Sequence, residues 1–291
     1  MKFATYEWGG QRRAGLLSAD GTELAPLEID ASRGLLALVA HLAGGGALPP
    51  VAGARLPLSA VALQAPLPRQ RRNLFCVGRN YRQHAKELAG SVFKASAEKE
   101  DGWPIVFTKL PECVVGPGAP VELPRLPGGG LVSEQIDYEA ELAVVIGRGG
   151  KNIPKSRALD HVFGYTIVND VTARDVQMRH SQWDLGKSFD TFCPMGPVIV
   201  TPDECDGTDT RVRLWMNGEL RQDGQTRDLI FDIPTLIETC SRGITLQPGD
   251  VIATGTPAGV GMGMTPPRWL ASGDAMRIEI DGIGVLENTV R

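Results

Sequence analysis

The sequence lacks long hydrophobic runs. Its first ten residues, MKFATYEWGG, contain no apolar stretch of the signal-peptide kind, and no segment approaches 18 uninterrupted apolar residues. Secretion and membrane spanning both depend on such runs. We therefore expect a cytoplasmic protein that neither crosses nor binds a membrane.

Cysteine is also scarce. The cysteines are Cys76, Cys113, Cys193, Cys205 and Cys240. They are odd in number and widely spaced, and they contain no C-x-x-C pair, which is typical of reduced thiols in a cytosolic protein. Cys193 stands close to the motifs described below, but no His follows it at a suggestive position. We interpret Cys193 as a buried structural thiol and not as a nucleophile.

Positive charge is not in excess. The chain has 30 Lys and Arg residues against 34 Asp and Glu residues, which gives a formal net charge of −4. The only basic cluster is RQRR at 69–72. Because nucleic-acid binding usually needs a basic surface, we expect no nucleic-acid partner.

The 291 residues are enough for a small domain and a large one. Residues 1–27 have the turn and strand pattern of an antiparallel meander, and SRGLLALVAHLAGG shows helical recurrence that ends at glycines. A Pro-rich connector, residues 49–73, follows. We therefore predict a small N-terminal α/β domain over 1–70 and a larger domain over 71–291.

The larger domain is predicted to be mainly β. Glycine and proline separate many short β-rich runs, and Asn217-Gly218 and Asp281-Gly282 are good hairpin turns. One clear helix begins at DIPTLIETCSRG, with Asp232 as its N-cap. Strands and helices do not alternate regularly, so the pattern indicates an α+β protein with a mixed sheet and not a Rossmann or TIM fold.

Three carboxylates stand in a pattern that suits one hard divalent cation. In a strand, residues two apart point to the same face, so Glu139 and Glu141 of DYEAELAVVIG would project together. Asp170 ends a second apolar run, VFGYTIVN. Oxygen ligands with no nearby Cys or His favour Mg²⁺ or Mn²⁺ over zinc. The alternative is that the two glutamates form only a solvated strand face.

A possible catalytic dyad occurs in NYRQHAKE. His84 and Glu87 are three residues apart, so on one helical turn they share a face and the carboxylate can orient the imidazole. That arrangement suits a general base near neutral pH. The alternative is a surface helix with a chance ion pair. The charged segment that follows, SVFKASAEKEDGW, would suit a mobile flap over a site or a plain surface loop.

A third motif, DVTARDVQ, follows Asp170. Thr172 is predicted to cap a short helix, on which Arg174 and Gln177 would share a face. An Arg beside a metal is a natural clamp for a substrate carboxylate. The alternative is that Arg174 only pairs with Asp175 or Glu141.

Two further pieces can contribute charge or hydrogen bonds. Lys187 in GKSFDTFCP can balance three carboxylates and polarise a carbonyl. The Gly-rich loop GTPAGVGMG lacks the Walker lysine, so phosphate binding is not expected. Thr256 and the adjacent amides could hydrogen-bond a substrate oxygen, or the loop could be a tight structural turn.

Together these motifs resemble the fumarylacetoacetate hydrolase family. The matching pieces, in order, are FCVGRNYRQHAKE, PIVFTK, DYEAELAVVIG, GYTIVNDVTARDVQ, the KSFDTF–GP segment and PGDVIATGTPAGVG, which span about residues 73–265. The continuation GVGMGMTPPRWL looks like the branch with diketo-deoxy sugar-acid hydrolases and ureidoglycolate-lyase-like proteins. The stretch RLPGGGLVSEQIDYE departs from the expected pattern and adds Glu134 and Asp137 as competing carboxylates.

The resemblance implies a mixed β-roll catalytic domain, a small N-terminal domain and a homodimer. It also implies roles for the motif residues, position by position. The Mg²⁺ or Mn²⁺ ligands would be Glu139, Glu141 and Asp170; the catalytic residues His84, Glu87 and Lys187; and the substrate contacts Arg79, Tyr81, Arg174, Gln177 and Thr256.

The implied activity is metal-dependent hydrolysis of a C–C bond. The substrate would be a small 2,4-diketo acid of the acylpyruvate type, cleaved to pyruvate or a related 2-oxo acid and a carboxylic acid. The same site could instead decarboxylate a β-keto acid of the oxaloacetate type or isomerise a hydroxymuconate-type diacid. Remoter alternatives are a non-catalytic metabolite-binding protein and thiol chemistry at Cys193.

Overall fold

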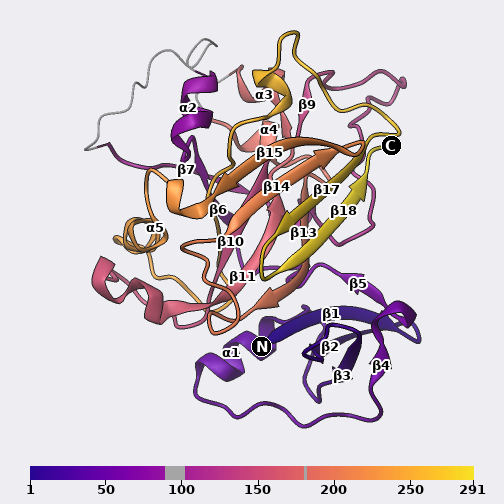
Figure 1. Ribbon diagram of the computed structural model, residues 1–291, viewed down its shortest axis with the longest axis vertical. Helices are drawn as coiled ribbons and strands as arrows, with labels where there is room; N and C mark the ends of the chain where they lie inside the picture. Colours follow the sequence, from indigo (N-terminus) through magenta and orange to yellow (C-terminus); the bar gives the residue numbers. More distant parts are fainter. Residues whose placement is uncertain (89–101, 180–181) are drawn as a thin grey trace.

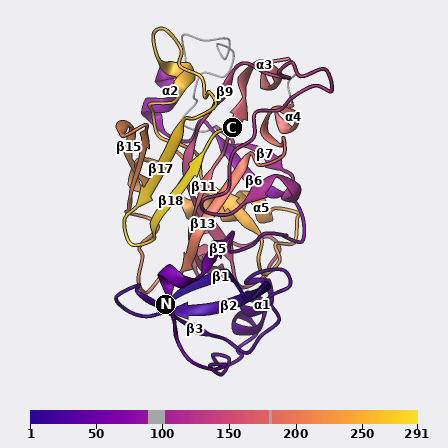
Figure 2. The ribbon, with the colours of Figure 1, turned by 90° about the vertical axis from the view of Figure 1, so that its right-hand side faces the viewer.

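The computed structural model describes residues 1–88, 102–179 and 182–291. The chain is mainly β and its sheets are mixed, as the sequence predicts (Figure 1). The N-terminal strands lie at one end of the molecule in Figures 1 and 2, and the short helices α2, α3 and α4 lie at the other end. The candidate site is built at that second end.

A twelve-stranded sheet runs through most of the chain. Its main path, in order of neighbouring strands, is β4 (Leu56–Pro57), β3 (Glu23–Pro26), β2 (Gln11–Leu17), β1 (Lys2–Trp8), β13 (Cys193–Val200), β11 (Val162–Asn169), β10 (Ala140–Ile146), β16 (Val251–Ala253), β6 (Leu74–Gly78) and β7 (Ile105–Lys109). Off this path, β5 (Ala62–Gln64) pairs with β1 and β8 (Val114–Val115) pairs with β13. The pairing of β1 with β13 continues the sheet from the N-terminal strands into the larger body.

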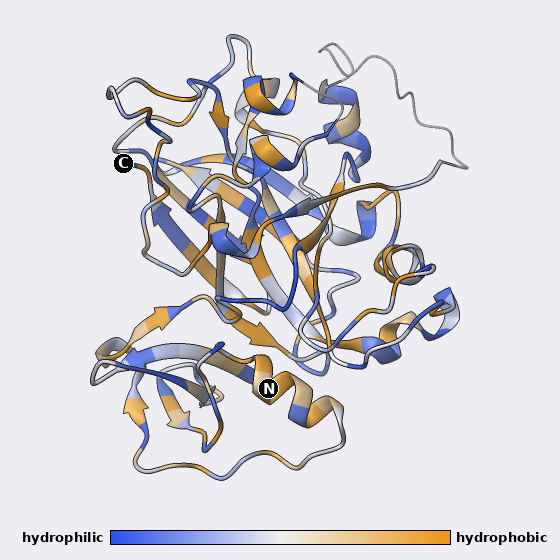
Figure 3. Ribbon diagram, turned by 180° about the vertical axis from the view of Figure 1, so that it is seen from behind, coloured by the Kyte–Doolittle hydropathy of each residue, from blue (hydrophilic) through white to orange (hydrophobic). Residues whose placement is uncertain are grey.

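The predicted N-terminal elements are present. Strands β1, β2 and β3 form the meander, and the helix α1 (Leu36–Ala43) ends at the glycine run. Figure 3 shows this helix as mostly hydrophobic, in keeping with its sequence LALVAHLA. Its buried residues join the hydrophobic core that fills the protein.

A four-stranded antiparallel sheet covers part of the larger body (Figure 2). Its strands, in order, are β15 (Glu219–Gln225), β14 (Arg211–Met216), β17 (Ala275–Ile280) and β18 (Gly284–Thr289). Both predicted hairpin turns occur, with Asn217-Gly218 between β14 and β15 and Asp281-Gly282 between β17 and β18. Asn217 and Gly218 have positive φ angles of 51° and 81°, which explains why these residue types stand there. A third, two-stranded sheet joins β9 (Ile136–Asp137) to β12 (Thr172–Ala173).

The remaining helices are short. They are α2 (Arg82–Leu88), α3 (Arg174–Gln177), α4 (Asp184–Lys187) and α5 (Ile233–Ser241), with 3₁₀ turns η1 (Leu58–Ala60), η2 (Pro111–Cys113), η3 (Lys155–His161), η4 (Thr226–Asp228) and η5 (Gly261–Gly263). No helix in the described part of the chain is long and apolar enough to cross a membrane.

One cap prediction is confirmed and one is wrong. Asp232 caps α5 by accepting the N–H of Thr235 at 2.9 Å. Thr172 does not cap α3, because it lies in β12 and its hydroxyl donates to the Asp170 carbonyl at 2.8 Å. Ala173 occupies the cap position and gives no side-chain cap. The β9–β12 pairing, which the local sequence does not reveal, holds Thr172 in a strand.

Candidate active site

The three predicted carboxylates meet where β10 begins and β11 ends. Antiparallel pairing sets Ala140 opposite Asn169, so Glu139 and Asp170 become neighbours and the Asp170 N–H donates to the Glu139 carbonyl at 2.8 Å. One oxygen from each of Glu139, Glu141 and Asp170 lies within 4.8 Å of the others. All three side chains are buried, so the solvated-face alternative is wrong.

Two buried lysines hold Asp170. The Lys187 ammonium lies 2.7 Å from Asp170 Oδ2 and 2.6 Å from Glu139 Oε2. Lys109, at the end of β7, lies 2.7 Å from Asp170 Oδ1 and also donates to the Val171 carbonyl. Burial favours the neutral amine, but the Asp170 carboxylate outweighs it and raises the pKa of Lys109. Lys109 is not among the site residues predicted from the sequence. The only signal was a lysine at the end of the apolar run PIVFT.

Arg174 is buried and bound by two carboxylates. Its guanidinium lies 2.9 Å from Asp137 Oδ2 and 2.6 Å from Glu139 Oε1, and it donates to Gln177 Oε1 at 3.2 Å. The alternative partners, Asp175 and Glu141, form no ion pair with it among the described residues. Asp175 accepts the Ser133 hydroxyl instead.

Asp137 does not compete for the cation position. Besides Arg174, it accepts the N–H groups of Gly261 and Met262, at 2.7 and 3.0 Å. It therefore ties Arg174 to the Gly-rich loop. Glu134, the other extra carboxylate, is exposed to solvent.

Glu141 carries the uncompensated charge. Four carboxylates are buried here against three cations, which leaves one net negative charge, and Glu141 forms no ion pair with any described residue. Among the described residues, its only hydrogen-bond donor is the Gly255 N–H, at 2.8 Å. Burial and the nearby Asp170 and Glu139 carboxylates raise the pKa of Glu141. An all-oxygen donor set with excess negative charge fits Mg²⁺ or Mn²⁺.

The pKa of Glu139 shifts in the opposite direction from that of Glu141, because Glu139 has ion-pair partners. Burial alone would raise its pKa, but Arg174 and Lys187 outweigh burial and hold the pKa of Glu139 well below its usual range. Two carboxylates two residues apart on one strand therefore differ strongly in basicity. Their partners, not their own sequence positions, set this difference.

The structure places His84 of the predicted dyad beside Glu139 and Glu141, in a pocket that all three line. On α2, His84 Nδ1 lies 3.1 Å from Glu87 Oε2, and His84 is buried. The other Glu87 oxygen accepts the Gly259 N–H at 3.0 Å. Because Nδ1 is engaged with the carboxylate, Nε2 is the ring atom left for proton transfer.

The Gly-rich loop binds the carboxylates of the protein itself. Its amides at Gly255, Gly259 and Gly261 donate to Glu141, Glu87 and Asp137, respectively. The Thr256 hydroxyl donates to the Ala140 carbonyl and accepts from Gln222, at 2.9 and 2.7 Å. The loop amides therefore help to hold these three carboxylates in position.

The pocket that joins these residues is small, about 20 Å³. Arg79, His84, Glu139, Glu141, Arg174, Gln177, Lys187 and Thr256 all line it. That volume admits about one water-sized body, such as a metal ion. Phe107 and Trp183 form an apolar side of the pocket, with ring centroids 5.2 Å apart.

Three predicted site residues do not line this pocket: Tyr81, Glu87 and Asp170. Glu87 and Asp170 contact residues that do, namely His84 and Lys187, whereas Tyr81 borders a separate cavity formed with β15 and the Gly-rich loop. The predicted flap, SVFKASAEKEDGW, lies largely outside the described residues, so the structure does not address it. Cys193 is buried, as predicted, and both its hydrogen bond with Cys113 and its burial raise the pKa of its thiol.

Comparison with known proteins adds to this geometry. Residues 73–291 match the family described as fumarylacetoacetate (FAA) hydrolase C-terminal. The chain is 52% identical over 234 residues to the oxaloacetate tautomerase YisK of Bacillus subtilis, covering 80% of this chain and 74% of the relative.

Solved structures also resemble the whole chain. A fumarylacetoacetate hydrolase from Exiguobacterium antarcticum superimposes with a TM-score of 0.84 at 42% identity, covering 100% of this chain and 99% of that one. A 5-carboxymethyl-2-hydroxymuconate delta-isomerase from Mycobacterium smegmatis gives a TM-score of 0.78 at 34% identity, with 100% and 98% coverage.

Proposed function

Because this chain belongs to the fumarylacetoacetate hydrolase family, we propose that it is a divalent-metal-dependent keto–enol tautomerase of a small 2-oxo dicarboxylate. The substrate class is that of oxaloacetate. Hydrolysis of a C–C bond, the first expectation from the sequence, ranks second, because the B. subtilis relative is named a tautomerase and the M. smegmatis neighbour an isomerase. The proposal keeps the homodimer that the resemblance implies.

One observation carries the proposal. His84, whose Nδ1 is engaged by Glu87, lines the same pocket as Glu139, Glu141 and Lys187. A base beside a positively charged group is the minimum equipment for moving a proton between carbon and oxygen. Tautomerisation needs nothing more, since it consumes no water and breaks no C–C bond.

The protein groups divide this work. Glu139, Glu141 and Asp170 would hold Mg²⁺ or Mn²⁺, which when bound supplies Lewis-acid stabilisation of negative charge on a substrate oxygen. His84 Nε2 takes the proton from the carbon next to the substrate carbonyl, and Glu87 stabilises the resulting imidazolium. The same proton is then delivered to the carbonyl oxygen, which gives the enol.

Lys187 and Arg174 provide positive charge around the substrate. Two of the three Lys187 N–H groups bind Glu139 and Asp170, which leaves one for a substrate oxygen. Arg174, fixed by Asp137, presents its guanidinium in the pocket and would bind a substrate carboxylate. We assign Arg79 and Gln177, which line the same pocket, to substrate binding as well.

Hydrolysis is the second candidate, because the E. antarcticum neighbour is named a fumarylacetoacetate hydrolase. In that reaction His84 would take its proton from water, and the water would attack the distal carbonyl. The dyad geometry serves both reactions. They differ in whether water enters the pocket.

Product analysis separates the candidates. Metal-stripped protein is mixed with oxaloacetate or acetylpyruvate, with and without Mg²⁺ or Mn²⁺, and NMR follows every species; metal without protein is the blank. We expect metal-dependent acceleration of keto–enol exchange in oxaloacetate, with the total amount of oxaloacetate conserved. Acetate and pyruvate from acetylpyruvate would establish the hydrolase instead. Pyruvate and CO₂ from oxaloacetate, above the blank, would establish a decarboxylase.

A further inference from the structure

A second cavity, of about 800 Å³, lies on another face of α2. Arg82, Gln83 and Lys86 line it, whereas His84 lines the candidate active-site pocket with its partner Glu87 beside it. At about 100° per residue, Arg82, Gln83 and Lys86 lie on one face of the helix. His84 and Glu87 lie on another face. The helix that carries the dyad therefore also forms a wall of this cavity.

The cavity holds surplus positive charge. Four basic side chains line it against two carboxylates, which gives a formal surplus of two positive charges. Asp223 binds Arg211 through two contacts, at 2.7 and 2.5 Å, and Asp209 lies 3.5 Å from Arg227. Arg82 and Lys86 form no ion pair with any residue in the described part of the chain. Their charge is available to a ligand.

Two buried polar atoms of the lining also lack a partner. Tyr81 Oη and Gln225 Oε1 are shielded from solvent, and neither makes a hydrogen bond to a described residue. Tyr81 is only 3% exposed. Buried polar groups are satisfied in nearly all native proteins, so an unsatisfied pair that borders one cavity calls for an explanation. A bound ligand with acceptor oxygens supplies one for Tyr81, whose hydroxyl can donate to it.

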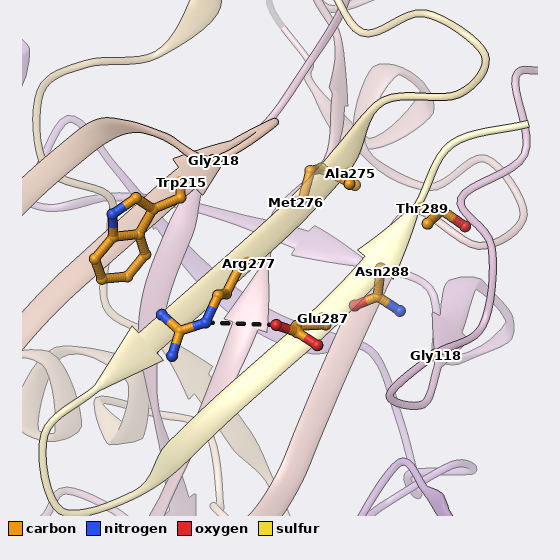
Figure 4. A pocket seen from close by; sticks show the side chains of 9 residues that line it. All are labelled: Gly118, Trp215, Gly218, Ala275, Met276, Arg277, Glu287, Asn288 and Thr289. Carbon is orange, nitrogen blue, oxygen red and sulfur yellow. Dashed lines mark ion pairs between the residues drawn. The ribbon is translucent and has the colours of Figure 1, made fainter.

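A cavity on the four-stranded sheet offers a contrast. It measures about 570 Å³ and lies over β14, β17 and β18 (Figure 4). Arg277 and Glu287 are its only charged lining residues, and they pair with each other at 3.4 Å beside Trp215. It therefore has no surplus charge. Of these two cavities, only the one beside α2 combines surplus positive charge with unsatisfied polar atoms.

The cavity is also connected to the dyad through the Gly-rich loop. Pro257 and Ala258 of this loop line it. The next residue, Gly259, donates its N–H to Glu87, and Gly255 donates to Glu141. A ligand in the cavity would thus contact both elements that position the dyad, α2 and the loop.

We propose that the cavity beside α2 is a regulatory site for a small dicarboxylate. Arg82 and Lys86, the two cations of the lining with no partner among the described residues, bind its two carboxylates, and the Tyr81 hydroxyl donates to one of its oxygens. Binding acts on turnover through α2. The regulatory part rests on the proposed tautomerase activity, whereas the binding part does not.

Binding is tested first, with succinate as the probe, because it has no 2-oxo group to place beside the carboxylate cluster. Calorimetric titration uses wild-type protein in EDTA, the His84→Ala variant, and the double variant Arg82→Gln/Lys86→Gln. We expect one succinate per chain, retained in EDTA and in His84→Ala, with affinity at least about tenfold lower in the double variant. A matched double variant, Arg55→Gln/Lys151→Gln, removes two exposed charges elsewhere and should bind as wild type does.

Three binding results would overturn the site. These are no saturable binding, binding that His84→Ala abolishes, and equal affinity in the Arg82→Gln/Lys86→Gln variant. Tighter binding of inorganic phosphate than of succinate would refute the dicarboxylate class.

Regulation is tested on the tautomerisation rate at saturating substrate. Succinate should change kcat about fivefold or more in the wild type and leave the double variant unchanged, as is typical of coupling between two sites. A change in KM alone would mean competition at the metal pocket and would refute the regulatory role. Failure of tautomerase activity itself leaves the binding result standing, so the two proposals fail separately.

Discussion

The two sides of α2 hold charge in opposite ways. On the dyad side, carboxylates and cations are buried, and their ion pairs are 2.6–2.9 Å long. On the cavity side, Arg82 and Lys86 are exposed and unpaired within the described chain. The paired, buried charges form the candidate active site, whereas the unpaired, exposed charges of Arg82 and Lys86 can bind a ligand. Substitutions on the two sides should therefore have different consequences.

The largest effect is expected at Asp170. Asp170→Ala leaves the buried ammoniums of Lys109 and Lys187 without their shared carboxylate, and breaking such a buried pair costs about 3–5 kcal/mol. Urea unfolding should show this loss, and Mn²⁺ binding followed by EPR should disappear. Asp228→Ala, on the cavity side, removes an exposed carboxylate and should change the unfolding free energy by no more than about 0.5 kcal/mol. Equal losses in the two variants would contradict the comparison.

A large effect on catalysis, with little effect on metal binding, is expected at His84. His84→Ala should lower turnover about 10²–10⁴-fold, the usual contribution of general acid–base catalysis. Steady-state kinetics measures it, and Mn²⁺ affinity serves as the internal check. Gln83→Ala, one position along α2 but on the cavity face, is the control and should keep its turnover. An active His84→Ala enzyme would remove the dyad from the mechanism.

A smaller effect on turnover is expected from a methyl group added at Gly263, which would contact Glu87 and not His84 itself. An added Cβ at Gly263 would lie 2.2 Å from Glu87 Oε1, so Gly263→Ala must displace that carboxylate. Misplacing a group that orients the base can cost about 10²-fold in rate. The fold should survive, because the displaced atom ends a flexible side chain. Gly130→Ala, which adds a Cβ in open space, is the matched control. If both variants turn over normally, Glu87 does not position His84.

The smallest effect is expected on the cavity side. The unfolding free energy of Arg82→Gln/Lys86→Gln should stay within about 0.5 kcal/mol of wild type, because neither side chain is paired within the described chain. Urea denaturation of the two proteins measures it. A loss above about 2 kcal/mol would show that these cations support the fold and are not free for a ligand.

Local patterns predicted most of the elements and the position of the carboxylate cluster. The two-residue period of a strand was enough to place Glu139 and Glu141 together, and the β10–β11 register then brought Asp170 beside them. Hairpin turns and the Asp232 cap follow from the φ angles and hydrogen bonds of single residues.

Contacts that depend on the pairing of strands far apart in the sequence could not be predicted from local patterns. The neighbours of β7 and β9 depend on sheet order, so the contact of Lys109 with Asp170 and the strand position of Thr172 had no local signal. The burial of Glu141, which decides its electrostatics, depends on β10 lying inside the sheet and not at its edge. Tyr81, although part of the dyad motif, precedes α2 and bridges to Leu229, and it lines the other cavity with that residue.

Metal dependence at Glu141 can be measured directly. Metal-stripped wild-type protein and its Glu141→Gln variant are titrated with Mn²⁺ while the absorbance of the oxaloacetate enol reports the rate of tautomerisation. Glu141 carries the excess negative charge of the pocket, so the wild-type rate should rise and saturate at one Mn²⁺ per chain. The variant should need far more Mn²⁺ or stay inactive. Full activity of the wild type without metal, or identical titrations of the two proteins, would contradict a metal-dependent tautomerase at this site.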